Sequence, residues 1–214
     1  MSIDGNIILS FFQMLNDNGV EYVLLRNIGN ELPFSLSQKK DIDILIKKES
    51  KDDFHRLMKK TGWHSVPHPW DFGNNFVFLY AMDKLEFYEN KEIHLDICYQ
   101  LCCRSVNNGE WMPLDQIIQD SVWKNRRINN TWPWYEMGDE DQLIHFLTRC
   151  IFDKKEFPDG YKTAISELYE KIDKDELRKK LDVVFFKFSP LLLSLLYERK
   201  FESIVNAYST FIEY

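Results

Sequence analysis

The hydrophobic positions of the chain follow two different patterns. Up to about residue 100, amphipathic helical stretches alternate with short strand-like runs, whereas apolar residues beyond residue 136 recur almost throughout at helical spacing. The first pattern predicts helices at 3–15 and 50–60, and strands at 21–25, 41–46, 76–80, 84–88 and 92–99. The second predicts helices at 139–153, 161–172 and 174–188, and a final pair around residues 191 and 204.

These elements predict an α+β protein, with a mixed β-sheet flanked by helices and an all-helical C-terminal region. The change of pattern divides the chain into an α/β domain at 1–135 and a helical domain at 136–214, and the segment 113–134 is assigned no element. With 214 residues, of which 44% are hydrophobic and 15% aromatic, the chain is long enough to build a core without disulfides.

Charge and cysteine content limit the possible partners and compartments. The net charge is −7 and neither part of the chain is basic, so we expect no nucleic-acid partner. No apolar run approaches the ~18 residues of a membrane helix, and residues 7–15 lack the basic flank of a secretory signal. The four cysteines form no CxxC pair, which favours reduced thiols in a cytoplasmic protein.

Two carboxylates stand on one face of the strand predicted at 41–46. Asp41 and Asp43 are separated by a single residue, which places their side chains about 7 Å apart on the same side of a strand. That spacing suits divalent cations that bridge phosphate oxygens. Asp96 alternates in the same way on the strand predicted at 92–99, and it would supply a third carboxylate if the two strands were neighbours. The alternative is an exposed edge strand with no function, beside Lys39 and Lys40.

The order of these elements resembles the nucleotidyltransferase fold of the DNA polymerase β superfamily in its small bacterial form. The resemblance covers residues 1–100 and rests on YVLLR at 22–26, on DIDILI at 41–46 and on the later strand IHLDI at 93–97. It implies that Asp41, Asp43 and Asp96 are catalytic residues that ligate Mg²⁺ or Mn²⁺. It also implies that an NTP is the substrate and that the C-terminal helices help to close the site.

One stretch departs from the family pattern. The superfamily usually carries a Gly-Ser pair after the first strand to hold the nucleotide's phosphates, whereas this chain has Arg26-Asn27-Ile28-Gly29. Arg26 could bind phosphate as a bidentate fork and Asn27 could donate as serine would, so we expect both to contact the nucleotide. In the alternative interpretation, Arg26 is a solvated charge at the end of a strand.

A polar stripe on the helix predicted at 139–153 provides further candidates. Asp141, His145 and Arg149 follow one another at intervals of four residues, beside an apolar face. We expect His145 and Arg149 to contact the nucleotide or substrate, with Asp141 orienting the imidazole. The alternative is a solvated helix face held by ion pairs.

Two aromatic segments are interpreted structurally. His64, His68 and Trp70 lie among prolines and are expected to form a surface or rim element. The segment 132–135 is expected to be an aromatic hinge packed into the core between the two parts.

Together these patterns favour a metal-dependent nucleotidyltransferase that moves a nucleotidyl group from an NTP to a small acceptor. The acidic balance favours a sugar, an alcohol or another small metabolite, and the resemblance suggests surface-polysaccharide or small-molecule modification in a bacterium. The missing Gly-Ser pair leaves two alternatives open. One is transfer of a phospho-alcohol group onto a glycan, and the other is a degenerate module that binds a nucleotide or a protein. The sequence does not determine the acceptor or the oligomeric state.

Overall fold

The computed structural model describes residues 2–38, 40–68, 77–78, 83–90, 93–104 and 110–211. The helices are α1 (Gly5–Asp17), α2 (Lys51–Lys60), α3 (Gln116–Asn125), α4 (Asp139–Thr148), α5 (Asp159–Lys171), α6 (Lys174–Phe185), α7 (Ser189–Tyr197) and α8 (Phe201–Thr210). Shorter helical turns are η1 (Lys48–Ser50), the π-helical η2 (Arg149–Lys154) and η3 (Phe186–Phe188). The strands are β1 (Tyr22–Leu24), β2 (Asp41–Ile46), β3 (His64–Val66), β4 (Val77–Phe78), β5 (Glu86–Asn90), β6 (Ile93–Cys98), β7 (Cys102–Arg104), β8 (Glu110–Pro113), β9 (Arg127–Ile128) and β10 (Tyr135–Glu136).

Within the described ranges, the main sheet has seven strands in the order β3-β5-β6-β2-β1-β10-β9. It is a mixed sheet, because β2 pairs in parallel with β6 and antiparallel with β1. β4, β8 and β7 form a smaller sheet of three strands. The predicted α+β class, the mixed sheet flanked by helices and the helical C-terminal region are therefore confirmed.

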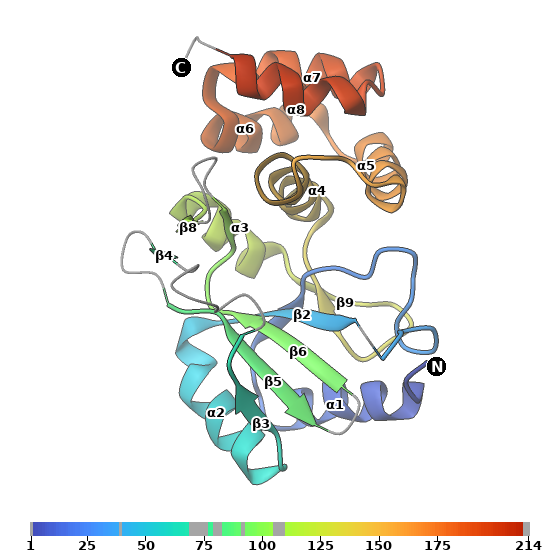
Figure 1. Ribbon diagram of the computed structural model, residues 1–214, viewed down its shortest axis with the longest axis vertical. Coiled ribbons are helices and arrows are strands. Elements are labelled where there is room, and N and C mark those ends of the chain that lie inside the picture. Colours follow the sequence, from blue (N-terminus) through green and yellow to red (C-terminus); the bar gives the residue numbers. More distant parts are fainter. Residues whose placement is uncertain are drawn as a thin grey trace.

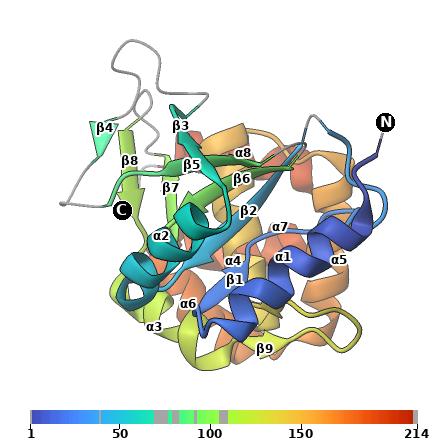
Figure 2. The ribbon, with the colours of Figure 1, turned by 90° about the horizontal axis from the view of Figure 1, so that it is seen from below.

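The sheet is covered on both faces, which gives the molecule three layers. Figure 2 shows α1 and α2 in front of the sheet, with the C-terminal helices behind it, and Figure 1 shows α4 and α5 above the strands. Alternation along β2 separates the two faces. Ile42, Ile44 and Ile46 belong to the apolar cluster of α1 and α2, while Leu45 belongs to the cluster of the C-terminal helices. Asp43 shares the face of Leu45, so the carboxylates point toward α4 and α5.

Local sequence explains several of the element boundaries. Asp4 caps α1 by accepting a hydrogen bond from the backbone N–H of Asn6, and Gly19, with φ 66°, allows the chain to turn after the helix. The predicted helix at 139–153 is α4 continued by η2, which ends where Lys155 adopts φ 56°. Arg149 is the first residue of η2.

The structure also contains elements that the sequence pattern did not indicate. Helix α3 lies in the segment 113–134, to which no element was assigned, and the helix predicted at 174–188 ends at Phe185 before η3. One apolar cluster runs from β1 and β2 into α4–α8, across the expected boundary at residue 135, so the division into two domains remains a prediction. No helix in the described part of the chain is long and apolar enough to cross a membrane.

Candidate active site

The three predicted carboxylates stand on adjacent strands of the sheet. β2 and β6 pair in parallel, with Asp43 opposite Asp96 and Asp41 opposite His94. Residues opposite each other in a parallel pair share one face of the sheet, so Asp41, Asp43 and Asp96 belong to one group. The condition on which the assignment of Asp96 depended, that its strand lies beside the strand of Asp41 and Asp43, is met.

Burial and mutual repulsion both act on the first two carboxylates of this group, Asp41 and Asp43. Burial, followed by the charges of Asp43 and Asp96, raises the pKa of Asp41, although much of the Asp41 side chain is exposed. Burial also raises the pKa of Asp43, with Asp96 acting in the same direction and the charge of Arg26 opposing both. Additional positive charge at this face would therefore be stabilising.

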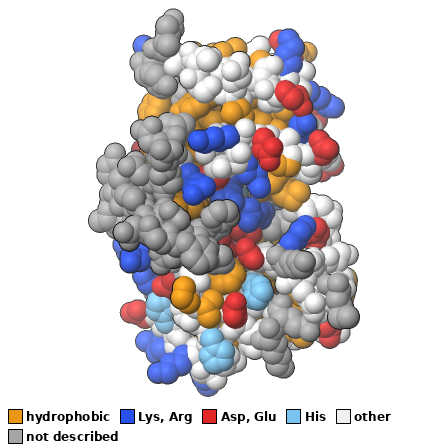
Figure 3. Space-filling view, in the orientation of Figure 1, with side chains coloured by type: hydrophobic (Ala, Val, Ile, Leu, Met, Phe, Trp, Pro, Cys, Tyr) orange, Lys and Arg blue, Asp and Glu red, His pale blue; other side chains and the backbone are white. Residues whose placement is uncertain are grey.

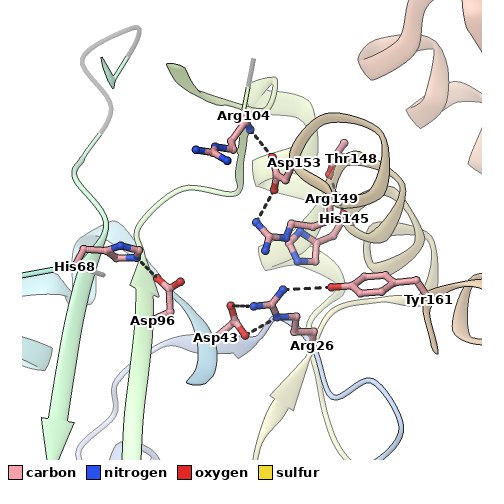
Figure 4. Close-up of polar contacts among 10 residues, drawn as sticks. All are labelled: Arg26, Asp43, His68, Asp96, Arg104, His145, Thr148, Arg149, Asp153 and Tyr161. Carbon is pink, nitrogen blue, oxygen red and sulfur yellow. Dashed lines mark hydrogen bonds and ion pairs between the residues drawn. The ribbon is translucent and has the colours of Figure 1, made fainter. Parts of the chain in front are cut away.

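Arg26 supplies the nearest positive charge through a bidentate contact with Asp43. Its Nε donates to Asp43 Oδ2 at 2.5 Å, and its Nη2 donates to Asp43 Oδ1 at 2.6 Å. The remaining Nη1 donates to the hydroxyl of Tyr161 at 3.2 Å (Figure 4). Burial acts to lower the pKa of Arg26, but the charge of Asp43 and these hydrogen bonds raise it above its ordinary value. Arg26 is thus not a solvated strand end.

Asn27 shapes the loop that follows Arg26. Its Oδ1 accepts a hydrogen bond from the backbone N–H of Leu32 at 3.0 Å, and its backbone carbonyl accepts from Asn30 at 3.1 Å. The side-chain oxygen of Asn27 therefore stabilises a turn. Contact between Asn27 and a nucleotide remains a prediction, which would use the amide NH₂ group.

His145 and Arg149 face the carboxylates from the opposite side of the site (Figure 4). His145 is 4% exposed, and its Nδ1 has no hydrogen-bond partner in the described part of the chain. Burial, with the charges of Arg149 and Arg26, lowers the pKa of His145 well below its ordinary value, so the imidazole is neutral at neutral pH. Arg149 pairs with Asp153 at 2.5 Å and is also within electrostatic range of Asp43.

Asp141 does not orient His145, contrary to expectation. It is fully buried and accepts hydrogen bonds from Ser121 at 2.8 Å, Asn125 at 3.2 Å and Lys180 at 2.6 Å. A helix places residues four apart on one side, but α3 and α6 pack there and supply these partners. The alternative of a solvated helix face is also wrong, because Asp141 and His145 are both buried.

Three residues that the sequence did not assign to the site also lie there. Tyr161 on α5 contacts Arg26, and Lys154 lies with its Nζ 5.6 Å from the centre of the Tyr161 ring. His68 was expected at the surface or rim, but it is buried, and its Nε2 lies 3.3 Å from Asp96 Oδ1. None of the three belongs to a motif, and only the folded chain brings them to the carboxylates. His64 is exposed, as expected, while Trp70 lies outside the described residues.

The aromatic segment 132–135 packs into the core, although mainly against the N-terminal helix. Trp134 is fully buried and its ring lies 5.3 Å from that of Phe12.

A cleft and a small cavity both border Asp43. A cleft of 570 Å³ is lined by Asp41, Asp43, Arg26, Lys154 and Tyr161 among others. A small cavity of 40 Å³ lies on the other side, between Asp43, Asp96, His145 and Arg149. Figure 3 shows Lys and Arg side chains gathered at mid-height on this face, with acidic side chains beside them. A larger cavity of 740 Å³ adjoins the cleft at residues 27–29 and contains none of the three carboxylates.

The carboxylates fit a divalent cation in chemistry but not in their present arrangement. Carboxylate oxygens are the ligands that Mg²⁺ and Mn²⁺ prefer, and the pKa values of Asp41 and Asp43 are raised first by burial and further by neighbouring carboxylates, whose repulsion a cation would offset. However, Arg26 occupies both oxygens of Asp43. In the described ranges, no three His, Cys, Asp or Glu residues are grouped so that they could hold a metal ion.

The chain matches no protein-family model and no curated protein sequence. Two solved structures of the antibiotic-resistance factor ANT(2'')-Ia are similar to it, each with 9% sequence identity. The solution structure aligns over 92% of this chain and 96% of that one, with a TM-score of 0.49. The crystal structure, a complex with adenylyl-2''-tobramycin, aligns over 82% and 93%, with a TM-score of 0.48. At such values, what this chain binds must be inferred from its own residues.

Proposed function

We propose that this protein is a metal-dependent nucleotidyltransferase that moves a nucleotidyl group from an NTP to a small acceptor. The observation that supports this function best is the register of β2 and β6, which puts Asp43 directly beside Asp96 on the face that carries Asp41. When bound at these carboxylates, Mg²⁺ or Mn²⁺ would neutralise charge on the phosphate oxygens and on the leaving group.

Positive side chains around the carboxylates suit the binding of a triphosphate. Arg26 and Lys154 line the 570 Å³ cleft, and Arg149 lines the small cavity on the other side of Asp43. Guanidinium groups bind phosphate with two parallel hydrogen bonds, whereas Lys154 acts as a point charge. His145 is neutral and its Nδ1 has no partner among the described residues, so the tautomer protonated on Nδ1 can donate a hydrogen bond to a phosphate oxygen without adding charge.

In the transfer we propose, a hydroxyl oxygen of the acceptor attacks the α-phosphorus of the NTP. A new P–O bond forms, the bond to the β-phosphate oxygen breaks, and pyrophosphate leaves. Asp96 receives the hydroxyl proton, because its carboxylate is a quarter exposed and so can reach an acceptor. Arg26 and Arg149 hold the phosphates in line and stabilise the charge that develops on them.

The cavities leave room for a small acceptor beside the nucleotide. The 740 Å³ cavity adjoins the cleft, and its lining mixes apolar and charged side chains with the amide and hydroxyl groups of Asn30, Asn129, Thr131 and Gln142. Neutral groups of this kind form hydrogen bonds with sugars and other polyols. We therefore propose a sugar or a similar metabolite as the acceptor.

One observation favours a second candidate function, a module that binds a nucleotide without catalysing its reaction. Arg26 pairs with both oxygens of Asp43, which leaves this carboxylate less available to a metal ion. A catalytic assay distinguishes the nucleotidyltransferase from the binding module, which forms no product. The identity of the product distinguishes nucleotidyl transfer from phospho-alcohol transfer. Nucleotidyl transfer releases pyrophosphate, whereas phospho-alcohol transfer from a nucleoside diphosphate carrier releases a nucleoside monophosphate.

The test incubates the protein with each NTP, Mg²⁺ or Mn²⁺ and a panel of sugars and polyols, with pyrophosphate and the adduct measured by enzymatic coupling and mass spectrometry. Asp41→Asn and Asp43→Asn should each lower turnover by more than about 100-fold. Replacing a residue that only supports a metal ligand already costs about 10- to 100-fold in activity, and these two variants remove a proposed ligand itself. Asp182→Asn, at a half-exposed carboxylate on α6, is the matched control. Nucleotide binding with no adduct in any combination would instead support the binding module.

A further inference from the structure

The bidentate contact between Arg26 and Asp43 has a consequence for the order of binding. We propose that Arg26 is a latch on Asp43, which the phosphates of the nucleotide must draw away before a divalent cation can bind that carboxylate. This inference rests on the proposed function, and it assigns Arg26 a second role besides contact with phosphate.

The contact leaves Asp43 with little capacity for a metal ion. Nε and Nη2 of Arg26 lie 2.5 and 2.6 Å from the two different oxygens of Asp43, so the guanidinium engages both carboxylate oxygens at once. The two side chains are only 23% and 12% exposed, which shields the pair from water and salt. A cation that approached Asp43 would meet a fixed positive charge in direct contact with its ligand.

The surroundings of Arg26 allow the exchange. Its third nitrogen, Nη1, is held by the Tyr161 hydroxyl, and both residues line the 570 Å³ cleft that Lys154 also lines. A phosphate in this cleft presents two oxygens in the same geometry as a carboxylate, so Arg26 can exchange one bidentate partner for the other. The guanidinium loses no hydrogen bonds in this exchange, and Asp43 becomes available.

The latch makes metal and nucleotide binding cooperative. A ligand that removes Arg26 from Asp43 raises the affinity for the cation, and by thermodynamic reciprocity the cation raises the affinity for that ligand by the same factor. Without nucleotide, the guanidinium itself neutralises Asp43. This arrangement explains why the carboxylates are in register and yet form no ready-made metal site among the described residues.

The experiment measures Mn²⁺ binding to the nucleotide-free protein, using the electron paramagnetic resonance signal of free Mn²⁺. Arg26→Ala should bind Mn²⁺ at least about tenfold more tightly than the parent, because the competing charge-assisted contact is gone. Arg26→Gln keeps most of the side-chain volume and should show the same direction of change if the alanine variant folds poorly. Arg178→Ala is the matched control, since Arg178 is exposed and lies near Asp182 on α6. It should bind Mn²⁺ as the parent does.

A double variant tests whether Asp43 is the residue responsible for the tighter Mn²⁺ binding. Adding Asp43→Asn to Arg26→Ala should abolish the gain, because the released carboxylate is the proposed ligand. Equal Mn²⁺ affinity in the parent and both Arg26 variants would overturn the latch, and so would a gain that persists without Asp43. Adduct formation is measured separately. A gain in Mn²⁺ affinity without nucleotidyl transfer would support the latch and contradict the proposed function, whereas transfer without the gain would do the reverse.

Discussion

Replacing Asp141 distinguishes a structural role for this residue from the orienting role that its spacing suggests. Asp141 is fully buried, and its hydrogen bonds to Ser121, Asn125 and Lys180 join α4 to α3 and α6. Asp141→Asn keeps the volume, but its amide has one accepting oxygen where the carboxylate has two, so it cannot accept from Ser121 on one side and from Asn125 on the other. The substitution also removes the counter-charge of Lys180, whose side chain is only 15% exposed.

The expected loss is about 3 kcal/mol, at the lower end of the 3–5 kcal/mol found when one partner of a buried ion pair is removed. For a chain of this length, such a loss lowers Tm by about 6–12 °C. Urea unfolding followed by circular dichroism measures the change in midpoint. Lys180→Met should cost a similar amount, and the double variant should lose less than the two single losses combined, because the pair is then absent altogether.

The folded Asp141→Asn variant should bind nucleotide with the affinity and pH dependence of the parent, because the side-chain hydrogen bonds of Asp141 in the described chain do not include His145. Asp182→Asn, at an exposed carboxylate, is the control and should change stability by less than about 0.5 kcal/mol. A midpoint no lower than that of this control would refute the structural role. A shifted pH profile at unchanged stability would restore the orienting role.

Two further predictions concern the titrating groups of the site. Since burial lowers the pKa of His145 in the folded state, the unfolded chain takes up a proton there first, and stability is lost as the pH falls below about 6.5. His145→Gln should flatten the stability curve between pH 6.5 and 5, and an unchanged slope would contradict a buried neutral imidazole. Since the pKa of Asp41 is raised, its ionised form costs stability at neutral pH. Asp41→Asn should therefore stabilise the protein by up to about 1 kcal/mol at pH 7 and not at pH 3.5, as measured by urea unfolding. An Asp41→Asn variant that is less stable than the parent at pH 7 would contradict the view that burial and the neighbouring carboxylates disfavour ionised Asp41.

The sequence alone determined the strand that carries the first two carboxylates, because strict alternation over six residues leaves only one way to bury Ile42, Ile44 and Ile46. The predicted bounds of 41–46 are those of β2. The strand that carries Asp96 and the helix that carries His145 were also predicted from local patterns, since each has an apolar face of the right period. The short helix α3 was missed, because Ile118 and Val122 are its only buried apolar residues and two positions give a weak helical period.

The tertiary structure decided which groups meet at the site. Arg26 and Asp43 are 17 residues apart, His68 and Asp96 are 28 apart, and Arg26 and Tyr161 are 135 apart. Side-chain chemistry says that Arg26 will seek an anion, but it does not say whether that anion is a phosphate or Asp43. Local periodicity fixes the side of a strand or helix on which a residue lies, because it depends on the backbone of that element alone. The group that a polar side chain contacts depends instead on which elements pack together. That packing is driven by the burial of two apolar clusters whose members come from the whole chain, so no short segment encodes it.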